Sequence, residues 1–205
     1  MSSLIASIAA THLQWFPEIQ IGWYPVTDQP YDAAYWAKYL KMDDTAVGAA
    51  LTRARVQLMA PYYSGGDVVD VGIGGGRFVR ERLAMGFDIN PQAVAWLKSQ
   101  DVFLDPYVEK VEAATFWDSL EHIHDPLPLL ANVRRWVFVS CPIFEGPEHV
   151  LRSRHYRKDE HCWYFTARGL EGFMAGAGFV LRETNPVESQ WREDIRSFVF
   201  ERAEG

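Results

Sequence analysis

The chain has 205 residues, of which 48% are hydrophobic and 23% charged, and its formal net charge is −7. This size and composition are those of one globular domain with a sizeable core, and they exclude a largely disordered chain. The negative charge argues against nonspecific binding to nucleic acid or to an anionic membrane. Two cysteines without CxxC spacing, no targeting signal and no apolar run of spanning length predict a cytoplasmic protein.

The first sixty residues are aromatic and interrupted by proline, and we expect them to form a helical and aromatic cap segment, residues 1–60. Residues 1–15 are mildly apolar and are interpreted as a helix or a loosely held arm. Helices are predicted over 32–41 and 45–59 from their apolar spacing. Of the aromatic residues, we expect most to pack against the sheet and one or two to form a lid; these residues are Tyr24, Tyr31, Tyr35, Trp36 and Tyr39.

From residue 61 to 205 the pattern alternates between short apolar strands and helices. Strands are expected at 68–71, 85–88, 102–105, 113–117, 136–140, 179–183 and 195–202, and helices at 78–83, 91–99, 127–133 and 166–177. Short apolar strands of this kind are typical of a parallel sheet that is covered on both faces. A polar loop joins the last two strands, which predicts an antiparallel pair. The sequence therefore indicates an α/β, doubly wound, seven-stranded sheet that is mostly parallel, with helices on both faces.

A glycine cluster follows the first of these strands in VVDVGIGGGRF, residues 68–78. The phosphate loop GxxxxGK[ST] is excluded because Arg77 stands where its second glycine would be. The dinucleotide fingerprint GxGxxG is also excluded, since its last position falls on Arg77 or Val79. What remains is D-x-G-x-G-x-G, formed by Asp70 and three alternate glycines.

An acid ahead of the glycine loop suits a positively charged amino group better than a phosphate. A second acid, Asp88, ends the next strand in GFDIN, where a carboxylate can accept hydrogen bonds from ribose hydroxyls. A ligand with a ribose, an amino-acid tail and no phosphate fits both acids. Asp70 and Asp88 therefore point to S-adenosylmethionine.

Three motifs in this order, VVDVGIGGGRF, GFDIN and TFWDSLEHIHDP, resemble the class I S-adenosylmethionine-dependent methyltransferases. The likeness is greatest to the small-molecule branch, whose fourth strand ends in D-x-L-E-H, and it covers residues 65–202. It implies a Rossmann-like sheet with the family's strand order, and a cofactor-binding domain over 61–205. It also implies contacts of the methionine part with Asp70, Gly72, Gly74 and Gly76, of the ribose with Asp88, of the adenine with Ile89 and Asp105, and of the methionine end with Asp118.

Candidate catalytic residues are Asp118, His122 and His161. His122 either faces the cofactor or serves as a base on the substrate, and the alternative is an ordinary polar position at a helix start. His161 belongs to the polar segment 145–165, which we interpret as a substrate-side insertion. The basic residues of this segment either receive an anionic group or form a solvated loop; they are Arg152, Arg154, Arg157 and Lys158.

Metal binding is not predicted for the cluster His149, His155, Glu160, His161 and Cys162, because its spacing lacks the close ligand pairs of zinc sites. The sequence therefore predicts a methyltransferase that acts on a small, planar or anionic acceptor. Two alternatives stay open. One is a protein or partner subunit that binds the cofactor without transferring a methyl group, and the other is a methyltransferase of protein or nucleic acid.

Overall fold

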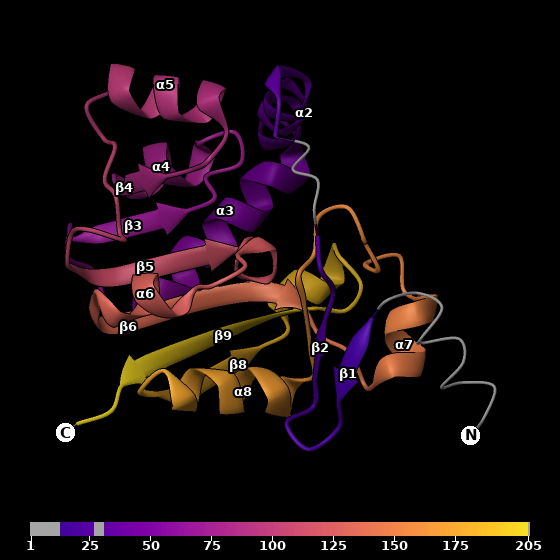
Figure 1. Ribbon diagram of the computed structural model, residues 1–205. Helices are drawn as coiled ribbons and strands as arrows, with labels where there is room; N and C mark the ends of the chain where they lie inside the picture. The colour runs from indigo at the N-terminus through magenta and orange to yellow at the C-terminus, as the bar shows by residue number, and fades with distance from the viewer. Residues whose placement is uncertain (1–12, 27–30, 205) are drawn as a thin grey trace.

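Two sheets and the helices that cover them make up the described chain (Figure 1). The computed structural model describes residues 13–26 and 31–204, so the helix or arm expected over residues 1–15 lies almost entirely outside the described residues. Within the part that is described, no helix has both the length and the apolar composition to cross a membrane.

The larger sheet has six strands in the order β4-β3-β5-β6-β9-β8. In chain order they are β3 (Val68–Val71), β4 (Met85–Phe87), β5 (Val111–Trp117), β6 (Val133–Pro142), β8 (Phe179–Asn185) and β9 (Ile195–Arg202). Strands β4, β3, β5 and β6 are parallel, whereas β9 runs antiparallel to both of its neighbours. This arrangement confirms the α/β, Rossmann-like, doubly wound fold with its C-terminal antiparallel pair.

The strand expected at 102–105 is reduced to a single parallel bridge between Gly86 and Phe103, so the sheet has six strands and not seven. Gly86 makes two backbone hydrogen bonds to this segment. The ladder ends there because Pro106 has no N–H to donate. In addition, the carboxylate of Asp105 accepts a hydrogen bond from the backbone two residues further on, which starts a turn.

Helices occupy the positions that the sequence predicts, with one addition. They are α2 (Ala33–Asp43), α3 (Ala46–Met59), α4 (Arg77–Arg82), α5 (Pro91–Ser99), α6 (Leu127–Ala131), α7 (Pro147–Arg152) and α8 (Ala167–Gly176), with short 3-10 turns η1 (Leu120–His122) and η2 (Val187–Gln190). Helix α6 ends before the expected residue 133 because Val133 already pairs with Val111 in the sheet. Helix α7 was not predicted.

The core lies on both faces of the larger sheet, because alternate strand residues point to opposite sides. On one face, Phe116 belongs to the same buried cluster as Leu129 of α6 and Leu170 of α8. On the other face, Phe138 is buried in a cluster with Leu58 of α3. The sheet is therefore covered on both sides, as the short apolar strands predict.

A second sheet of three antiparallel strands, β1-β2-β7, lies beside the end of the larger sheet toward which β3 and β5 point (Figure 1). Its strands are β1 (Gln14–Phe16), β2 (Ile21–Trp23) and β7 (Trp163–Phe165). Two of these strands fall where a helical and aromatic cap was expected, and the third falls in the predicted insertion. Each has three residues, and β2 and β7 are far apart along the chain, so no local pattern marks their pairing.

Gly169 of α8 is one of the points at which the second sheet contacts the rest of the domain. A Cβ atom at this glycine would lie 2.3 Å from the backbone oxygen of Gln20, in the turn between β1 and β2. The N–H of Thr166 donates to the same oxygen at 3.2 Å, and its hydroxyl donates to the Gln20 side chain at 3.0 Å. The helix therefore needs a residue without a side chain where this turn approaches.

Two substitutions in α8 test this contact. Gly169→Ala is expected to lower the free energy of unfolding by about 1–3 kcal/mol, because the added methyl group meets backbone that must shift. Gly172→Ala, where nothing lies within 4 Å of the added Cβ, is expected to raise it by about 0.5–1 kcal/mol through helix propensity. Urea unfolding measures both values. A stabilising effect of both substitutions would contradict the close approach of Gln20 to α8.

Candidate functional site

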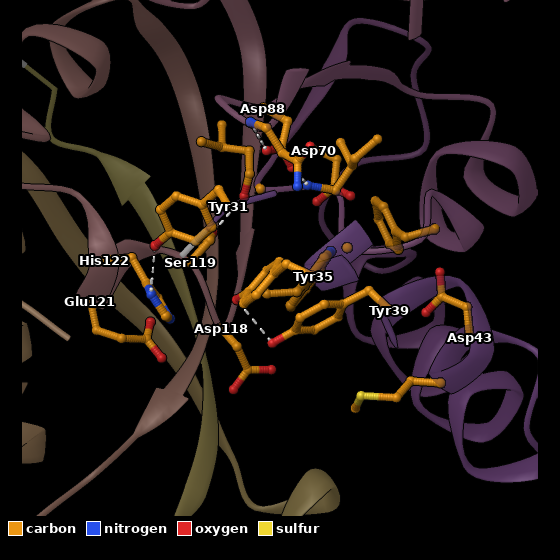
Figure 2. Close-up of a pocket in the computed structure, with 18 of the residues that line it drawn as sticks. Tyr31, Tyr35, Tyr39, Asp43, Asp70, Asp88, Asp118, Ser119, Glu121 and His122 are labelled. Atoms are coloured by element: carbon orange, nitrogen blue, oxygen red, sulfur yellow. Dashed lines mark hydrogen bonds between the residues drawn. The ribbon is translucent and has the colours of Figure 1, made fainter. Parts of the chain in front are cut away.

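A cavity of about 760 Å³ lies at the carboxyl ends of β3, β4 and β5, where open α/β sheets bind ligands. Figure 2 shows Asp70 and Asp88 at the top of the view of this cavity, tyrosines across its middle, and His122 with Glu121 at the left. Most of the predicted site residues line it: Asp70, Gly72, Gly74, Asp88, Ile89, Asp118, His122 and His161. The structure therefore brings the glycine-loop and GFDIN residues into one cavity with Asp118, His122 and His161.

The glycine loop after β3 depends on a left-handed backbone, with φ of 77° at Gly72, 56° at Gly74 and 78° at Gly76. These values are uncommon for residues with a side chain. A Cβ at Gly72 would also lie 2.6 Å from the Cβ of Ser119, the residue after Asp118. The loop can therefore pack directly against the chain that leaves β5. Gly76 does not line the cavity and is instead packed against the ring of Trp96.

Asp88 connects the glycine loop to the start of α5. One carboxylate oxygen accepts the N–H of Ile73 at 3.0 Å, and the other accepts the N–H of Asn90 at 2.8 Å. Burial raises the pKa of Asp88, although the backbone hydrogen bonds oppose this shift. Each oxygen keeps a further lone pair for a ligand. Ile89, which is 54% exposed, adds an apolar surface beside it.

Asp70 lies at the floor of the cavity and is only 1% exposed. Its carboxylate accepts a hydrogen bond of 2.7 Å from the hydroxyl of Thr115 in β5. Burial nevertheless raises the pKa of Asp70 to about 7, against the opposing effects of Thr115 and Arg55. This carboxyl group therefore changes its charge near neutral pH.

Asp105, for which an adenine contact was predicted, is not among the residues that line the cavity. Its carboxylate accepts the N–H of Tyr107 at 2.9 Å and caps the turn that follows. Tyr107 itself lines the cavity, and its ring lies 5.7 Å from that of Phe87 in an edge-on arrangement. No pattern in the sequence singled out Tyr107.

Asp118 is held by two arginines at the end of β5. Arg192 donates to both of its carboxylate oxygens, one of them at 2.7 Å, and Arg55 donates at 3.1 Å. Burial alone would raise the pKa of Asp118, but the two arginines outweigh it and hold the pKa below its usual value. Asp118 is therefore an anchored anion, which leaves it poorly suited to take up a proton as a base.

Glu188 of η2 completes this buried network and was not found from the sequence. It is fully buried, accepts from Arg55 at 2.8 and 3.0 Å, and accepts from the hydroxyl of Ser140 at 2.9 Å. Its partners come from α3 and β6, far away along the chain. Only the fold brings them together, so neither Glu188 nor the two arginines had a local signal.

His122, Glu121 and His161 form the opposite wall. The hydroxyl of Tyr31 and Nδ1 of His122 share a hydrogen bond of 3.2 Å, whose direction depends on the tautomer. The rings of His122 and His161 are 4.6 Å apart, edge to face. Burial lowers the pKa of His122 to about 4, and burial together with the positive charge of nearby groups lowers the pKa of His161 well below its usual value. Burial, with the charge of Asp118 nearby, raises the pKa of Glu121 well above its usual value.

Aromatic residues before and within α2 face the cavity and not the sheet. Tyr31, Tyr35, Trp36 and Tyr39 all line it, and α2 contains no buried residue. The Tyr35 and Tyr39 hydroxyls are hydrogen-bonded at 3.2 Å. The expectation that most of these residues pack onto the sheet is therefore wrong, and only Tyr24 lies elsewhere, against a separate apolar cluster.

The predicted substrate-side insertion reaches the cavity through a few residues only. Arg157 and His155 line the cavity together with His161, whereas the other three basic residues of the segment do not. Arg157 pairs with Glu160 at 3.2 Å. His149 lies apart from this cluster and pairs with Asp194 at 3.4 Å.

Comparison with known proteins agrees with this geometry. The sequence profile of a family described as a methyltransferase domain matches residues 45–184. A search of curated protein sequences finds no match. Similar solved structures are magnesium protoporphyrin IX methyltransferase from Synechocystis PCC 6803 with bound SAH (15% identity, TM-score 0.60, 83% of this chain and 94% of that chain), 1,6-didemethyltoxoflavin-N1-methyltransferase from Burkholderia thailandensis (15%, 0.57, 94% and 100%) and a SAM-dependent methyltransferase from Aquifex aeolicus (13%, 0.58, 82% and 98%).

At these identities the solved structures show a shared fold. The family profile extends from α3 to β8 and spans Asp70, the glycine loop, Asp88 and the two histidines His122 and His161. Because this match covers more than half of the chain, the protein belongs to the methyltransferase-domain family.

Proposed function

We propose that the protein transfers a methyl group from S-adenosylmethionine to a small molecule, as a member of the branch marked by D-x-L-E-H. The observation that carries this proposal is the single cavity in which Asp70, Asp88 and the glycine loop face Tyr31 and His122 (Figure 2). Two of the similar structures contain S-adenosylhomocysteine, which the transfer of the methyl group would leave behind, and this supports the choice of cofactor.

The cofactor half of the cavity offers the chemistry that this molecule needs. Asp88 has carboxylate lone pairs for the ribose hydroxyls, and Ile89 presents an apolar surface to the adenine. The left-handed backbone at Gly72 and Gly74 allows the methionine part to approach the main chain. Asp70 supplies a carboxylate for the amino group. When bound, the cofactor supplies an electrophilic methyl group on a sulfonium.

The acceptor half points to a compact and planar molecule. Its walls are the rings of Tyr31, Tyr35 and Tyr39, which offer flat apolar surface, and Lys38 and Arg157 supply positive charge at the edge. The whole volume of about 760 Å³ is within the range of small-molecule sites, roughly 300–1,000 Å³. The similar Burkholderia structure contains 1,6-didemethyltoxoflavin, a small molecule. Positioning of the acceptor in line with the methyl group would supply much of the rate.

A protein that binds the cofactor without transferring its methyl group is the second candidate. One observation favours it: Asp118, a predicted catalytic residue, is held by Arg192 and Arg55 and is not free to accept a proton. Incubation with radiolabelled S-adenosylmethionine and a panel of planar metabolites, proteins and nucleic acids separates the two. Label on a small molecule supports the first candidate, and cofactor binding without any labelled product supports the second.

The cofactor is tested by calorimetric titration with S-adenosylhomocysteine, NAD and ATP. We expect micromolar binding of S-adenosylhomocysteine alone. Asp88→Ala is expected to weaken it by about 10- to 150-fold, because it removes hydrogen bonds to a charged acceptor. Asp105→Asn is the matched control: its carboxylate lies outside the cavity lining, so the affinity should not change. A preference for NAD or ATP would overturn the proposal.

The affinity for S-adenosylhomocysteine is expected to depend on pH through Asp70. Because burial raises the pKa of this group to about 7, it takes up a proton as the pH falls below that value and loses its attraction for the amino group. The affinity should therefore fall on going from about pH 8 to about pH 6, by at most about tenfold per pH unit below the pKa.

Asp70→Asn provides the control for this titration, since the ligand's own ionisation is common to both proteins. The variant is expected to bind more weakly at about pH 8 and to show a flatter dependence on pH. Equal slopes for the variant and the wild type would show that Asp70 does not titrate against the ligand.

A further inference from the structure

Three metal-ligating side chains converge on the wall of the cavity that faces the acceptor. One ligand atom from each of Glu121, His122 and His161 lies within 4.8 Å of the others. The sequence predicted no metal for the cluster around His161, which did not include Glu121 or His122, because its spacing lacks the close ligand pairs of zinc sites. Glu121 and His122 are adjacent, and His161 comes from the distant 145–165 segment. The fold, and not the sequence, assembles the group.

The backbone holds these residues in place. The N–H of Cys162 donates to the carbonyl of Glu121 at 2.8 Å, and the indole of Trp163 donates to the carbonyl of Ile123 at 2.7 Å. The thiol of Cys162 lies 3.5 Å from the carbonyl of His122. The chain that carries His161 is therefore fixed along η1, and the three side chains start from a rigid frame.

Polar atoms in this group lack partners. Among the described residues, both carboxylate oxygens of Glu121 and Nδ1 of His161 lack a hydrogen-bond partner. Glu121 is only 1% exposed and His161 only 4%. Buried polar groups are almost always paired, and leaving one unpaired costs about 1–3 kcal/mol, more for a charged group. A further group that binds all of these atoms would remove this cost.

Charge balance favours a cation as that group. The neighbouring carboxylates already have arginine partners: Asp118 pairs with Arg192, Glu188 with Arg55, and Glu160 with Arg157. Within the described part of the chain, Glu121 makes no ion pair or hydrogen bond through its carboxylate. It is therefore the acid at this wall that has no cationic partner among the described residues, and a bound cation would allow it to ionise although burial raises its pKa.

We propose that Glu121, His122 and His161 bind one divalent transition-metal ion of the kind that prefers nitrogen and carboxylate ligands, with Zn²⁺ as the best match. Ligand atoms around such an ion lie roughly 3.3 Å apart, since each is about 2.0–2.2 Å from the metal. The ligand atoms must approach one another by up to about 1.5 Å, which side-chain rotations of Glu121 and the two histidines can provide. In the tautomer in which Nδ1–H of His122 donates to the hydroxyl of Tyr31, Nε2 would bind the ion, and this hydrogen bond would orient the ring.

An ion with three protein ligands keeps a coordination position open, as catalytic zinc sites do. Since all three residues line the cavity, that position would face the acceptor and could bind one of its oxygen or nitrogen atoms. This consequence rests on the proposed function, whereas the binding of the metal does not.

Metal binding is measured on the full chain after removal of bound ions with EDTA. Zn²⁺ uptake is followed by calorimetry and elemental analysis, and Co²⁺ uptake by its visible absorption. We expect one ion per chain. Glu121→Gln and His161→Asn should each weaken binding by at least about tenfold, since even loss of an outer-shell partner costs 10- to 100-fold.

His149→Asn is the matched control, because this histidine pairs with Asp194 away from the cavity, and it should bind Zn²⁺ as the wild type does. Cys162→Ser shows whether a thiol takes part and is expected to leave the Co²⁺ spectrum unchanged. Binding of S-adenosylhomocysteine is measured for each variant in the absence of metal. Affinity equal to that of the wild type shows that the variant is folded, and the same measurement tests the proposed function separately from the metal site. The metal site is overturned if the wild type takes up no stoichiometric ion, or if folded Glu121→Gln and His161→Asn bind it as tightly.

Discussion

The buried charge network at the end of β5 determines the geometry of the whole cavity. Arg55 comes from α3, Glu188 from η2, and Arg192 from the loop before β9, and all three meet around Asp118. Removing one member of such a network strands a charge, which costs about 3–5 kcal/mol. Asp118 also adopts a left-handed backbone, with φ of 57°, and so turns the chain from β5 into η1. The network thereby helps to set the direction in which η1 presents Glu121 and His122.

The two halves of the cavity are built by different means. In the cofactor half, hydrogen bonds between side chains and the backbone hold the site in place. Asp88 accepts from two backbone N–H groups, and the hydroxyl of Ser119 donates to the carbonyl of Val71 at 2.5 Å. In the acceptor half, the wall is made of tyrosine side chains on α2, a helix with no buried residue. Few buried apolar contacts mean a low local stability. The cofactor half is therefore fixed in advance, whereas the tyrosine side of the acceptor half, on α2, can adapt to what it binds.

This difference explains what the sequence could predict. The glycine loop and α5 were predicted closely, because their signals are local: alternate glycines, the cap at Asn90 and the proline after it. The six-residue α4 and the acids Asp70 and Asp88 followed from the same stretch. Features that depend on distant partners were missed, among them the arginine network, the β1-β2-β7 sheet and helix α7. At Asp105, where the resemblance implies an adenine contact, the chain forms a turn and not a strand end, and that contact stays a prediction.

Some buried acids at this cavity have arginine partners, whereas Glu121 has none among the described residues. This difference bears on function. At the end of β5, the carboxylates of Asp118 and Glu188 are matched by guanidinium groups, which fixes their positions and leaves them little chemistry of their own. At the wall formed by Glu121, His122 and His161, the first and last are buried and His122 is half-buried, yet Nδ1 of His161 and the carboxylate of Glu121 have no hydrogen-bond partner among the described residues. Buried polar groups are almost always paired, so leaving these atoms bare would lower the stability of the fold. Buried titratable groups with strongly shifted pKa values cluster at functional sites, so we expect the reactivity of this protein at the wall formed by Glu121, His122 and His161.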